Sequence, residues 1–211
     1  TVGDNGTILT SPNGVNWMLQ PVPVSNRLRA VTFGDGQFVV VGEKGIILTS
    51  QDGREWELEE SDTATNLNGI VFGAERYVAV GNSRTVLVSP NGQDWQQIEV
   101  TAGTESLQSV TFGQGLFVAV GDFGLVMTSP DASVWTVLQV GEEPPFWLDA
   151  VFCQERFAIT GTPGKVAYSR DGVQWRVQNT ATDHFLYGIT CSPRGDVVVG
   201  DFGTILQSPP S

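Results

Sequence analysis

The sequence predicts an all-β protein, a five-bladed β-propeller of four-stranded antiparallel blades that is closed by exchange of its N- and C-terminal strands. Three observations support this prediction. A unit of 39–40 residues recurs along the 211-residue chain, each unit reads as four short strands, and the inner strands are apolar on both faces. Sheets of this kind must be covered by neighbours on both sides, and a ring of blades around an axis provides that cover.

Two markers set the period, and they keep the same register. A tryptophan recurs once per unit, at spacings of 39, 39, 40 and 40 residues. A glycine that follows Val or Thr recurs with it, and agreement between two independent markers excludes a chance repeat. The markers are Trp17, Trp56, Trp95, Trp135 and Trp175, together with Gly3, Gly42, Gly81, Gly121, Gly161 and Gly200.

One unit illustrates the four expected strands, which we name a, b, c and d. Runs of β-branched and aromatic residues lie at 28–33, 37–42, 46–50 and 55–59, separated by Gly, Asp or Asn turns that are typical of antiparallel hairpins. Strands b and c do not alternate apolar with polar residues, so both of their faces should be buried. Strand d alternates apolar and polar residues in part, so one of its faces should be exposed to solvent.

Counting these strands gives the order c-d, four complete units, then a-b-c. We expect one domain, 1–211, with blades at 28–66, 67–106, 107–147 and 148–185 and a closing blade made of 186–211 and 1–27. Segment 204–208 repeats the strand c of segment 7–11 and is left over by this count. It could add an edge strand, exchange into a second molecule and form an oligomer, or belong to a longer repeat array. A six-bladed or incomplete ring is the alternative architecture.

Composition disfavours several classes of partner. The chain has 11 Lys plus Arg against 23 Asp plus Glu, a formal net charge of −12. Nucleic acids and anionic membranes are bound largely through clustered cations, so we expect no nucleic acid as a partner and no affinity for such membranes. No run of apolar residues approaches the roughly 20 residues of a membrane helix, so we expect no membrane insertion. No basic and apolar leader opens the sequence, and we expect its start to be a cut.

The corner between strands c and d repeats the pattern Ser-x-Asp/Asn-Gly-x-x-Trp, at residues 11–17, 50–56, 89–95, 129–135 and 169–175. A short Asx side chain can accept backbone N–H bonds and fix such a turn, glycine tolerates positive φ, and Trp can cover the hairpin. The pattern resembles the Asp-box (BNR) hairpin of sialidases, of the photosystem II stability and assembly factor and of many secreted propellers. The resemblance covers the whole chain.

The resemblance implies a structural role for all five corners, and export to a periplasm, a lumen or the extracellular space. The pattern departs from the usual box by one residue between the acid and the glycine. Two of the five acids are Asn, and Ala132 replaces one glycine. A calcium loop is the alternative interpretation, but no Asp-x-Asp-x-Asp run is present. We expect no metal site and no cofactor.

Two cysteines and one histidine are the remaining candidates for chemistry. In the repeat alignment Cys191 takes the position of Phe33 and Cys153 that of Gly34, on opposite sides of strand a in adjacent blades. We therefore expect two buried thiols rather than a disulfide. His184 lies in a polar loop before strand a, where a solvated histidine is expected in preference to a catalytic one.

A sialidase-like glycoside hydrolase is the enzymatic alternative that the resemblance implies. Sialidases hold a substrate carboxylate with an arginine cluster and use a tyrosine with an acid at the anomeric centre. Arg27 and Arg29 could supply two arginines, with Tyr187 and Asp149 nearby, but the aligned positions offer no third arginine. We therefore predict that the protein is not an enzyme.

The connections from strand d to the next strand a differ most between repeats, and all of them should emerge on one face of a propeller. They lie at 20–27, 60–66, 101–106, 141–147 and 179–185. Repeats that share a scaffold and vary on one face usually bind something there. Polar residues near the start of strand a are expected at one equivalent ring position: Arg29, Asn68, Gln108, Asp149 and Tyr187.

Trp147 and Phe185 are expected to project from two successive loops beside this ring, with His184 in the second loop. Exposed aromatic rings beside amides and carboxylates suit a protein hot spot or sugar stacking. Trp147 could instead only cover the blade below it.

The sequence thus predicts a non-enzymatic binding or scaffold module that recognises a protein partner through the face of the d-to-a loops. A carbohydrate-binding, lectin-like propeller is the alternative. A multivalent lectin should repeat its ligand residues, and these loops do not, although a single sugar site near Trp147 stays open.

Overall fold

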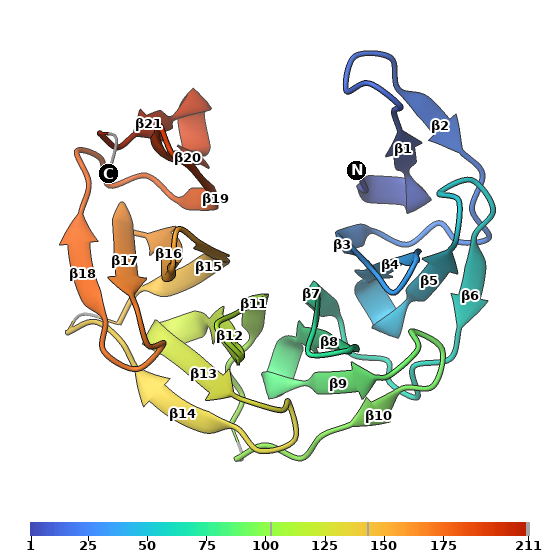
Figure 1. Ribbon diagram of the computed structural model, residues 1–211, viewed down its shortest axis with the longest axis horizontal. Helices are drawn as coiled ribbons and strands as arrows, with labels where there is room; N and C mark the ends of the chain where they lie inside the picture. The colour runs from blue at the N-terminus through green and yellow to red at the C-terminus, as the bar shows by residue number, and fades with distance from the viewer. Residues whose placement is uncertain (102, 143, 210–211) are drawn as a thin grey trace. The chain divides into compact units, whose positions relative to one another are not determined.

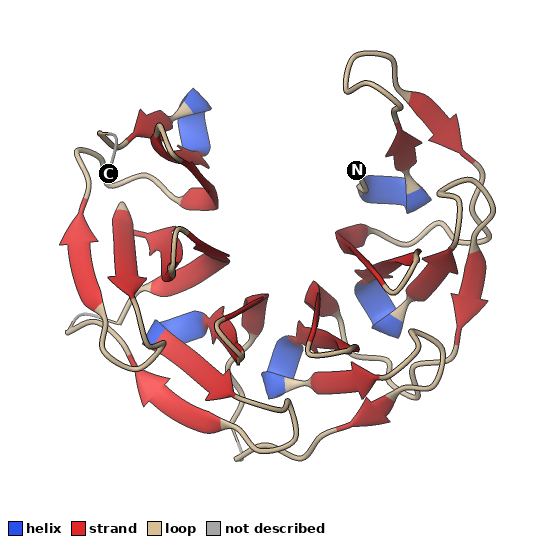
Figure 2. Ribbon diagram, viewed as in Figure 1, coloured by secondary structure: helices blue, strands red, loops and turns tan. Residues whose placement is uncertain are grey.

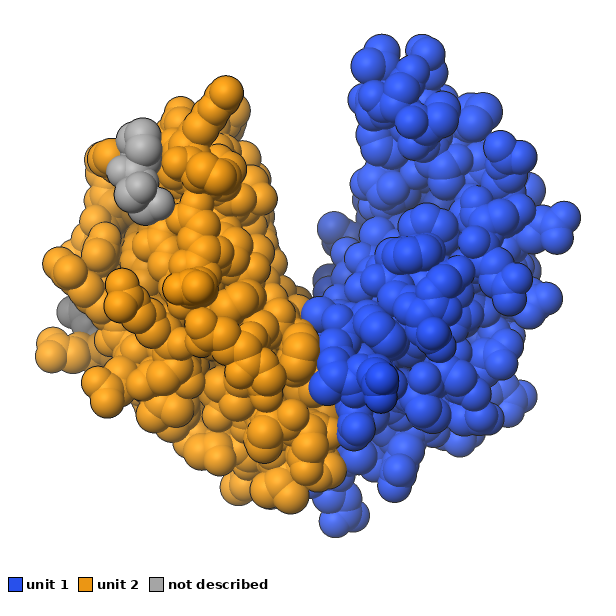
Figure 3. Space-filling view, in the orientation of Figure 1, with its two compact units in different colours: residues 1–99 blue, residues 100–211 orange. Residues whose placement is uncertain are grey.

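A computed structural model describes residues 1–101, 103–142 and 144–209 of the chain. These residues form antiparallel β-sheets joined by turns and short 3-10 helices (Figures 1 and 2), which confirms the all-β prediction. They divide into two compact units, residues 1–99 and 100–211 (Figure 3). No helix in the described part of the chain is both long and apolar enough to cross a membrane.

The first unit is built from sheets whose strands follow one another in the chain. A two-stranded sheet, β1–β2, precedes the four-stranded sheets β3–β6 and β7–β10. The elements are η1 (Asp4–Gly6), β1 (Ile8–Thr10), β2 (Met18–Gln20), β3 (Leu28–Gly34), β4 (Gln37–Gly42), η2 (Glu43–Gly45), β5 (Ile47–Ser50), β6 (Glu57–Glu59), β7 (Leu67–Gly73), β8 (Arg76–Gly81), η3 (Asn82–Arg84), β9 (Val86–Ser89) and β10 (Gln96–Gln97).

The second unit continues the pattern with the four-stranded sheets β11–β14 and β15–β18 and the three-stranded sheet β19–β21. Its elements are β11 (Leu107–Gly113), β12 (Leu116–Gly121), η4 (Asp122–Gly124), β13 (Leu125–Ser129), β14 (Thr136–Gln139), β15 (Phe146–Cys153), β16 (Arg156–Thr162), β17 (Lys165–Ser169), β18 (Arg176–Asn179), β19 (Leu186–Ser192), β20 (Gly195–Gly200), η5 (Asp201–Gly203) and β21 (Ile205–Gln207).

The predicted order c-d, four complete sheets, then a-b-c is confirmed. Strand d of the illustrated unit is shorter than expected, because Glu55 and Trp56 belong to the corner that precedes it. The leftover segment forms β21, which pairs antiparallel with β20 as the third strand of the last sheet. The union of β19–β21 with β1–β2 in one closing blade, and the total of five blades, stay predictions.

The inner strands bury both faces, as their lack of alternation predicts. In β4, Val39 and Val41 pack with Leu67 of the following sheet, whereas Val40 packs with Ile8 of the preceding one. Strand β16 is covered in the same way by its two neighbouring sheets in the second unit. Full burial of a side chain of this size stabilises a fold by about 1.5–3 kcal/mol, so each sheet depends on those stacked against it.

The c-to-d corners form the hydrogen bonds that the motif predicts. Asp52 Oδ1 accepts bonds from the backbone N–H groups of Arg54, at 2.8 Å, and Glu55, at 3.0 Å. Trp56 Nε1 donates to the carbonyl of Gly53 at 3.3 Å and so covers the turn. Equivalent Asx bonds recur at the corners of Asn13, Asn91, Asp131 and Asp171.

These hydrogen bonds favour the ionised form of the corner acids. Bonds from the backbone N–H groups, of Glu55 and Gln174 foremost, lower the pKa values of Asp52 and Asp171. The N–H of Ser133 is the main cause that lowers the pKa of Asp131 to about 2. At this corner Ala132 takes the positive φ, 60°, that glycine adopts at the others.

The cysteine prediction was wrong, because Cys153 and Cys191 form a disulfide with their Cα atoms 6.4 Å apart. In two other repeats a glycine of one sheet lies directly against a phenylalanine of the next, where a Cβ on the glycine would strike the ring. Residues on opposite sides of strand a in adjacent sheets therefore face each other across the sheet interface. The glycine–phenylalanine pairs that the disulfide replaces are exemplified by Gly34 with Phe72 and Gly113 with Phe152.

We expect the disulfide to stabilise the contact between β15 and β19. Changing both cysteines to serine should lower the free energy of unfolding by about 2–4 kcal/mol, because the bridge closes a long loop, with a sequence separation of 38. The paired change Cys153→Gly with Cys191→Phe restores the glycine–phenylalanine contact of two other repeats. It should therefore lower the free energy of unfolding by less than the double serine change does. Urea unfolding measures both; equal stability of the serine variant and the oxidised parent would contradict the assignment.

We also expect the corner acids to make stability depend on acid pH. Their folded pKa values lie below the ordinary value of an aspartate, so the stability they contribute is present above about pH 4 and is lost as the pH falls toward 2. Replacing Asp52, Asp131 and Asp171 by Asn keeps the acceptor oxygen that Asn13 and Asn91 supply naturally. The triple variant should show a flatter fall of Tm between pH 6 and pH 2 than the parent, and equal slopes would refute the assignment.

Candidate functional site

Each sheet carries two kinds of connection at one of its ends, which we call the loop end. These are the d-to-a loops and the turns after strand b, which form the 3-10 helices η1–η5 (blue in Figure 2) except in the sheet β15–β18, where β17 follows β16 without one. Backbone bonds hold them together: Asp122 N donates to the carbonyl of Ser106 at 3.0 Å, and Asp201 N donates to that of Phe185 at 2.9 Å. Both connections therefore contribute to the surface on which the sequence places its candidate residues.

The residues predicted for the ring position take equivalent places in their strands in four repeats, and their side chains are already paired. Each residue lies where strand a shifts register against strand b, and each contacts the residue 14 positions later, at the start of the 3-10 turn. The pairs are Arg29 with Glu43 (2.8 Å), Asn68 with Asn82 (3.0 Å), Gln108 with Asp122 (2.9 Å), and Tyr187 with Asp201.

Asp149 does not belong to this ring, which corrects the alignment by one residue. It pairs with Thr160, as Ser109 of the previous sheet pairs with Val120, and Leu148 takes the ring position. Its carboxylate accepts bonds from the Ser109 hydroxyl at 3.0 Å and from the backbone N–H of Ile189, also at 3.0 Å. Burial raises the pKa of Asp149. This side chain therefore links three successive sheets.

Trp147 is also not a loop residue. It lies in β15 opposite Gly161, at the position that Leu107 occupies opposite Gly121, and its side chain is 0% exposed. Its Nε1 donates to the carbonyl of Val140 at 3.3 Å. Trp147 therefore packs in the core, which agrees with the alternative prediction that it only covers the blade below it. A side chain buried in this way cannot contact a ligand. The 40-residue spacing from Leu107 already places Trp147 at this core position. The prediction of a loop residue was wrong because the repeats were aligned by residue type, which put Leu148 there instead.

His184, Phe185 and Tyr187 lie together at the loop end. His184 Nδ1 is 2.6 Å from the hydroxyl of Thr204, and its ring packs on Phe202 with centroids 5.0 Å apart. Phe185 and Tyr187 are both exposed, with ring centroids 6.1 Å apart. The hydrogen bond to Asp201 raises the pKa of Tyr187, so its hydroxyl stays protonated.

Sequence reasoning missed two phenylalanines in the 3-10 turns, Phe123 and Phe202. Each is the central residue of an Asp-Phe-Gly turn with φ 54°, and they are 56% and 90% exposed. Phe123 also contacts the exposed Phe146 at 4.9 Å between ring centroids. The signal was available, since the equivalent central residues in the first unit are the polar Asn5, Lys44 and Ser83. We call these loop-end rings together the aromatic surface; it comprises one pair, Phe123 with Phe146, and a second group on the next sheet, His184, Phe185, Tyr187 and Phe202.

Acidic residues predominate in the connections that carry the aromatic surface. The loop end of the second unit carries five described acids against Lys165 at the start of β17. The acids are Glu105, Asp122, Glu142, Asp183 and Asp201. In residues 1–101, 103–142 and 144–209, no group of three or more His, Cys, Asp or Glu side chains is arranged to hold a metal ion. The arrangement offers apolar rings, hydrogen-bond acceptors and negative charge.

No protein-family model matches the chain, and no curated protein matches its sequence significantly. Solved structures do match. A YCF48 bound to D1 peptide is 19% identical, with a TM-score of 0.76 over 99% of this chain and 73% of that one. YCF48 from Cyanidioschyzon merolae is 16% identical, with a TM-score of 0.75 over 99% of this chain and 77% of that one.

A second kind of protein has a similar structure. Virginiamycin B lyase from Staphylococcus aureus is 10% identical, with a TM-score of 0.83 over 99% of this chain and 82% of that one. At these identities the likeness establishes the fold alone. Together with the stacked antiparallel sheets, it shows that the chain has a β-propeller fold.

Proposed function

We propose that this chain is a non-enzymatic binding module that recognises a protein partner through the loop end, chiefly through the aromatic surface. The observation that carries the proposal is the exposure of Phe123 and Phe202 on left-handed turns. A phenylalanine at such a position gains little from packing, and a positive φ is unfavourable for it. Asn5 fills the same turn position in the first unit, so the fold does not require an aromatic ring there.

The chemistry of this surface favours a partner segment with apolar and basic side chains. Exposed aromatic rings supply large contact areas of the kind that dominate protein hot spots. The surrounding acids, with Asp122 and Asp201 beside the two phenylalanines, would attract Lys or Arg of the partner and raise the association rate. The net charge of −12 acts in the same direction.

The comparisons support a protein ligand in one respect. A protein with a similar fold has been solved with a bound peptide, so the fold is compatible with peptide recognition. The lyase shows that the same fold also occurs in an enzyme. At 10% identity, no residue role can be transferred from it to this chain.

The alternatives are less well supported by the side chains. A single sugar site near Trp147 would need that ring to be exposed for stacking, but the side chain is buried. For a sialidase-like site, Arg27 and Arg29 are held in ion pairs with Asp4, at 2.9 Å, and Glu43, at 2.8 Å.

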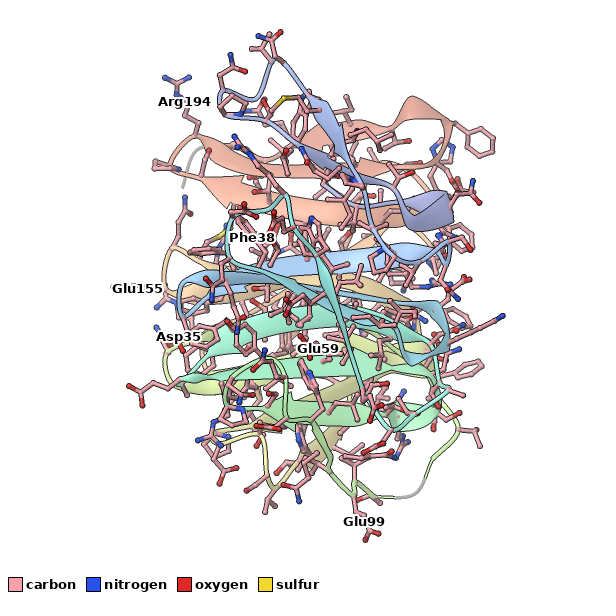
Figure 4. All side chains as sticks on the ribbon, turned by 90° about the vertical axis from the view of Figure 1, so that its right-hand side faces the viewer. Asp35, Phe38, Glu59, Glu99, Glu155 and Arg194 are labelled. Carbon is pink, nitrogen blue, oxygen red and sulfur yellow. A yellow bond between two sulfur atoms is a disulfide. The ribbon has the colours of Figure 1, made fainter. Side chains whose placement is uncertain are left out.

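Photo-crosslinking at single positions tests the proposal. A benzoylphenylalanine in place of Phe202 should crosslink a discrete protein in cells of the source organism, whereas the same residue in place of Arg194 should not. Arg194 is exposed at the opposite end of the last sheet (Figure 4). Crosslinks from both positions, or from Arg194 alone, would contradict the loop end as the binding surface.

A matched variant measures the contribution of the rings. Phe202→Asn with Phe123→Ser copies residues that the first unit carries at these turns, so Tm should not fall by more than a few degrees. Affinity for the crosslinked partner should fall roughly tenfold or more. Unchanged affinity would refute the aromatic surface, and glycan-array binding lost in this variant would favour the carbohydrate alternative instead.

A further inference from the structure

A second feature lies at the other end of the sheets, which we call the corner end because it holds the c-to-d corners and the a-to-b turns. Glu155 and Arg194 mark this end of the second unit in Figure 4. Here the sheet β15–β18 has a hollow of about 510 Å³. Three of its lining residues are Arg156, Arg170 and Arg176, out of 11 basic residues in the whole chain.

The side chain of Arg156 lines this hollow and is held in place by its neighbours. Its Nη2 donates to both carboxylate oxygens of Asp196 in the next sheet, at 3.0 and 2.9 Å, and its guanidinium lies 4.4 Å from the ring centroid of Tyr168. Asp196 is only 2% exposed and also accepts the hydroxyl hydrogen of Tyr168 at 2.9 Å. The buried carboxylate thus neutralises Arg156 and orders both side chains before any ligand arrives.

Arg170 and Arg176 are different, because they are exposed and have no carboxylate within ion-pair distance in the described part of the chain. Arg176 lies directly opposite Tyr168 in the β17–β18 pair, and Arg170 follows two residues after Tyr168 at the corner. One acid, Asp171, also lines the hollow, and its Oδ1 accepts the backbone N–H groups of Val173 and Gln174 in its own turn. The hollow therefore presents two available guanidinium groups beside one that is held in place.

The chain provides its own comparison at the equivalent hollow of the sheet β3–β6, whose volume is about 350 Å³. There Gln37 takes the position of Arg156, Gln51 that of Arg170, and Glu57 that of Arg176. These equivalences follow from the strand pairing and the corner motif. The same scaffold thus makes an acidic hollow in one repeat and a basic one in another, so packing does not demand the arginines.

We propose that the hollow formed by Arg156, Arg170 and Arg176 is a binding site for an oxyanion, a phosphate, sulfate or carboxylate group of a ligand. Guanidinium groups suit such anions because their planar array of donors matches two oxygens at once. Trp175 lines the same hollow and adds an aromatic side chain to it for apolar contact with the rest of the ligand. The site is separate from the loop end and does not depend on the function proposed for that surface.

Calorimetric titration with inorganic phosphate, sulfate and succinate, each at constant ionic strength, tests the site and separates phosphate or sulfate groups from carboxylates. We expect saturable binding of at least one of these anions. Arg170→Gln with Arg176→Gln should weaken it roughly tenfold or more, since charge-assisted hydrogen bonds are lost. Gln51 and Gln96 already occupy these positions in other repeats, so the variant should fold.

Arg54→Gln is the matched control. Arg54 is exposed at the corner of the acidic hollow, and Gln93 is its equivalent in the next repeat, so the change removes the same charge elsewhere without disturbing the fold. It should leave binding unchanged. Guanidinium NMR signals of the parent give a readout that needs no variant, and those of Arg170 and Arg176 should shift with bound anion. The proposal is overturned if none of the three anions binds saturably, or if the double variant binds as tightly as the parent.

Discussion

Apolar packing between successive sheets is the interaction on which the rest of the structure depends. A strand such as β4 or β16 has no solvent-facing side, and its valines, isoleucines and alanines are buried only because another sheet lies on each face. The approach is close enough that Gly34 could not carry a Cβ beside Phe72. The repeat must therefore keep small and large residues in matched places, and a disulfide can replace such a pair only where both partners change together, as at Cys153 and Cys191.

Packing between the sheets restricts the residue type at some positions of the repeat and not at others. The strands of different repeats are similar because they share one packing problem. The central residues of the 3-10 turns and the walls of the corner hollows contribute little to that packing, and they range from Lys44 to Phe202 and from Glu57 to Arg176. Both proposed binding surfaces include such unrestricted positions, at opposite ends of the sheets. A common scaffold can thus carry different chemistry in each repeat.

Much of the fold was predictable, because spacing and turn chemistry are local properties of the sequence. The period located the strands and their order, and the corner motif predicted the hydrogen bonds of Asp52. The candidate site was predicted less well. Trp147 and Asp149 were placed one residue out of register, because residue type was followed where the 40-residue spacing was the better guide.

Two further errors had different causes. The disulfide was rejected from the directions of Cys153 and Cys191 relative to their own strands, whereas in a stack opposite faces of neighbouring sheets are in contact. Phe123 and Phe202 were missed because the sequence prediction placed the binding residues on the more variable d-to-a loops and at the start of strand a. That their turns expose the central side chain is evident only from the left-handed backbone.

Amide hydrogen exchange, resolved by strand, tests the dependence on stacking most directly. If burial between sheets supplies the stability, the amides of β4 and β16 should exchange slowest, at rates set by global unfolding, while those of the outer strands β6 and β18 exchange far faster. Equal protection of inner and outer strands would mean that individual hairpins hold themselves together, and it would contradict this account.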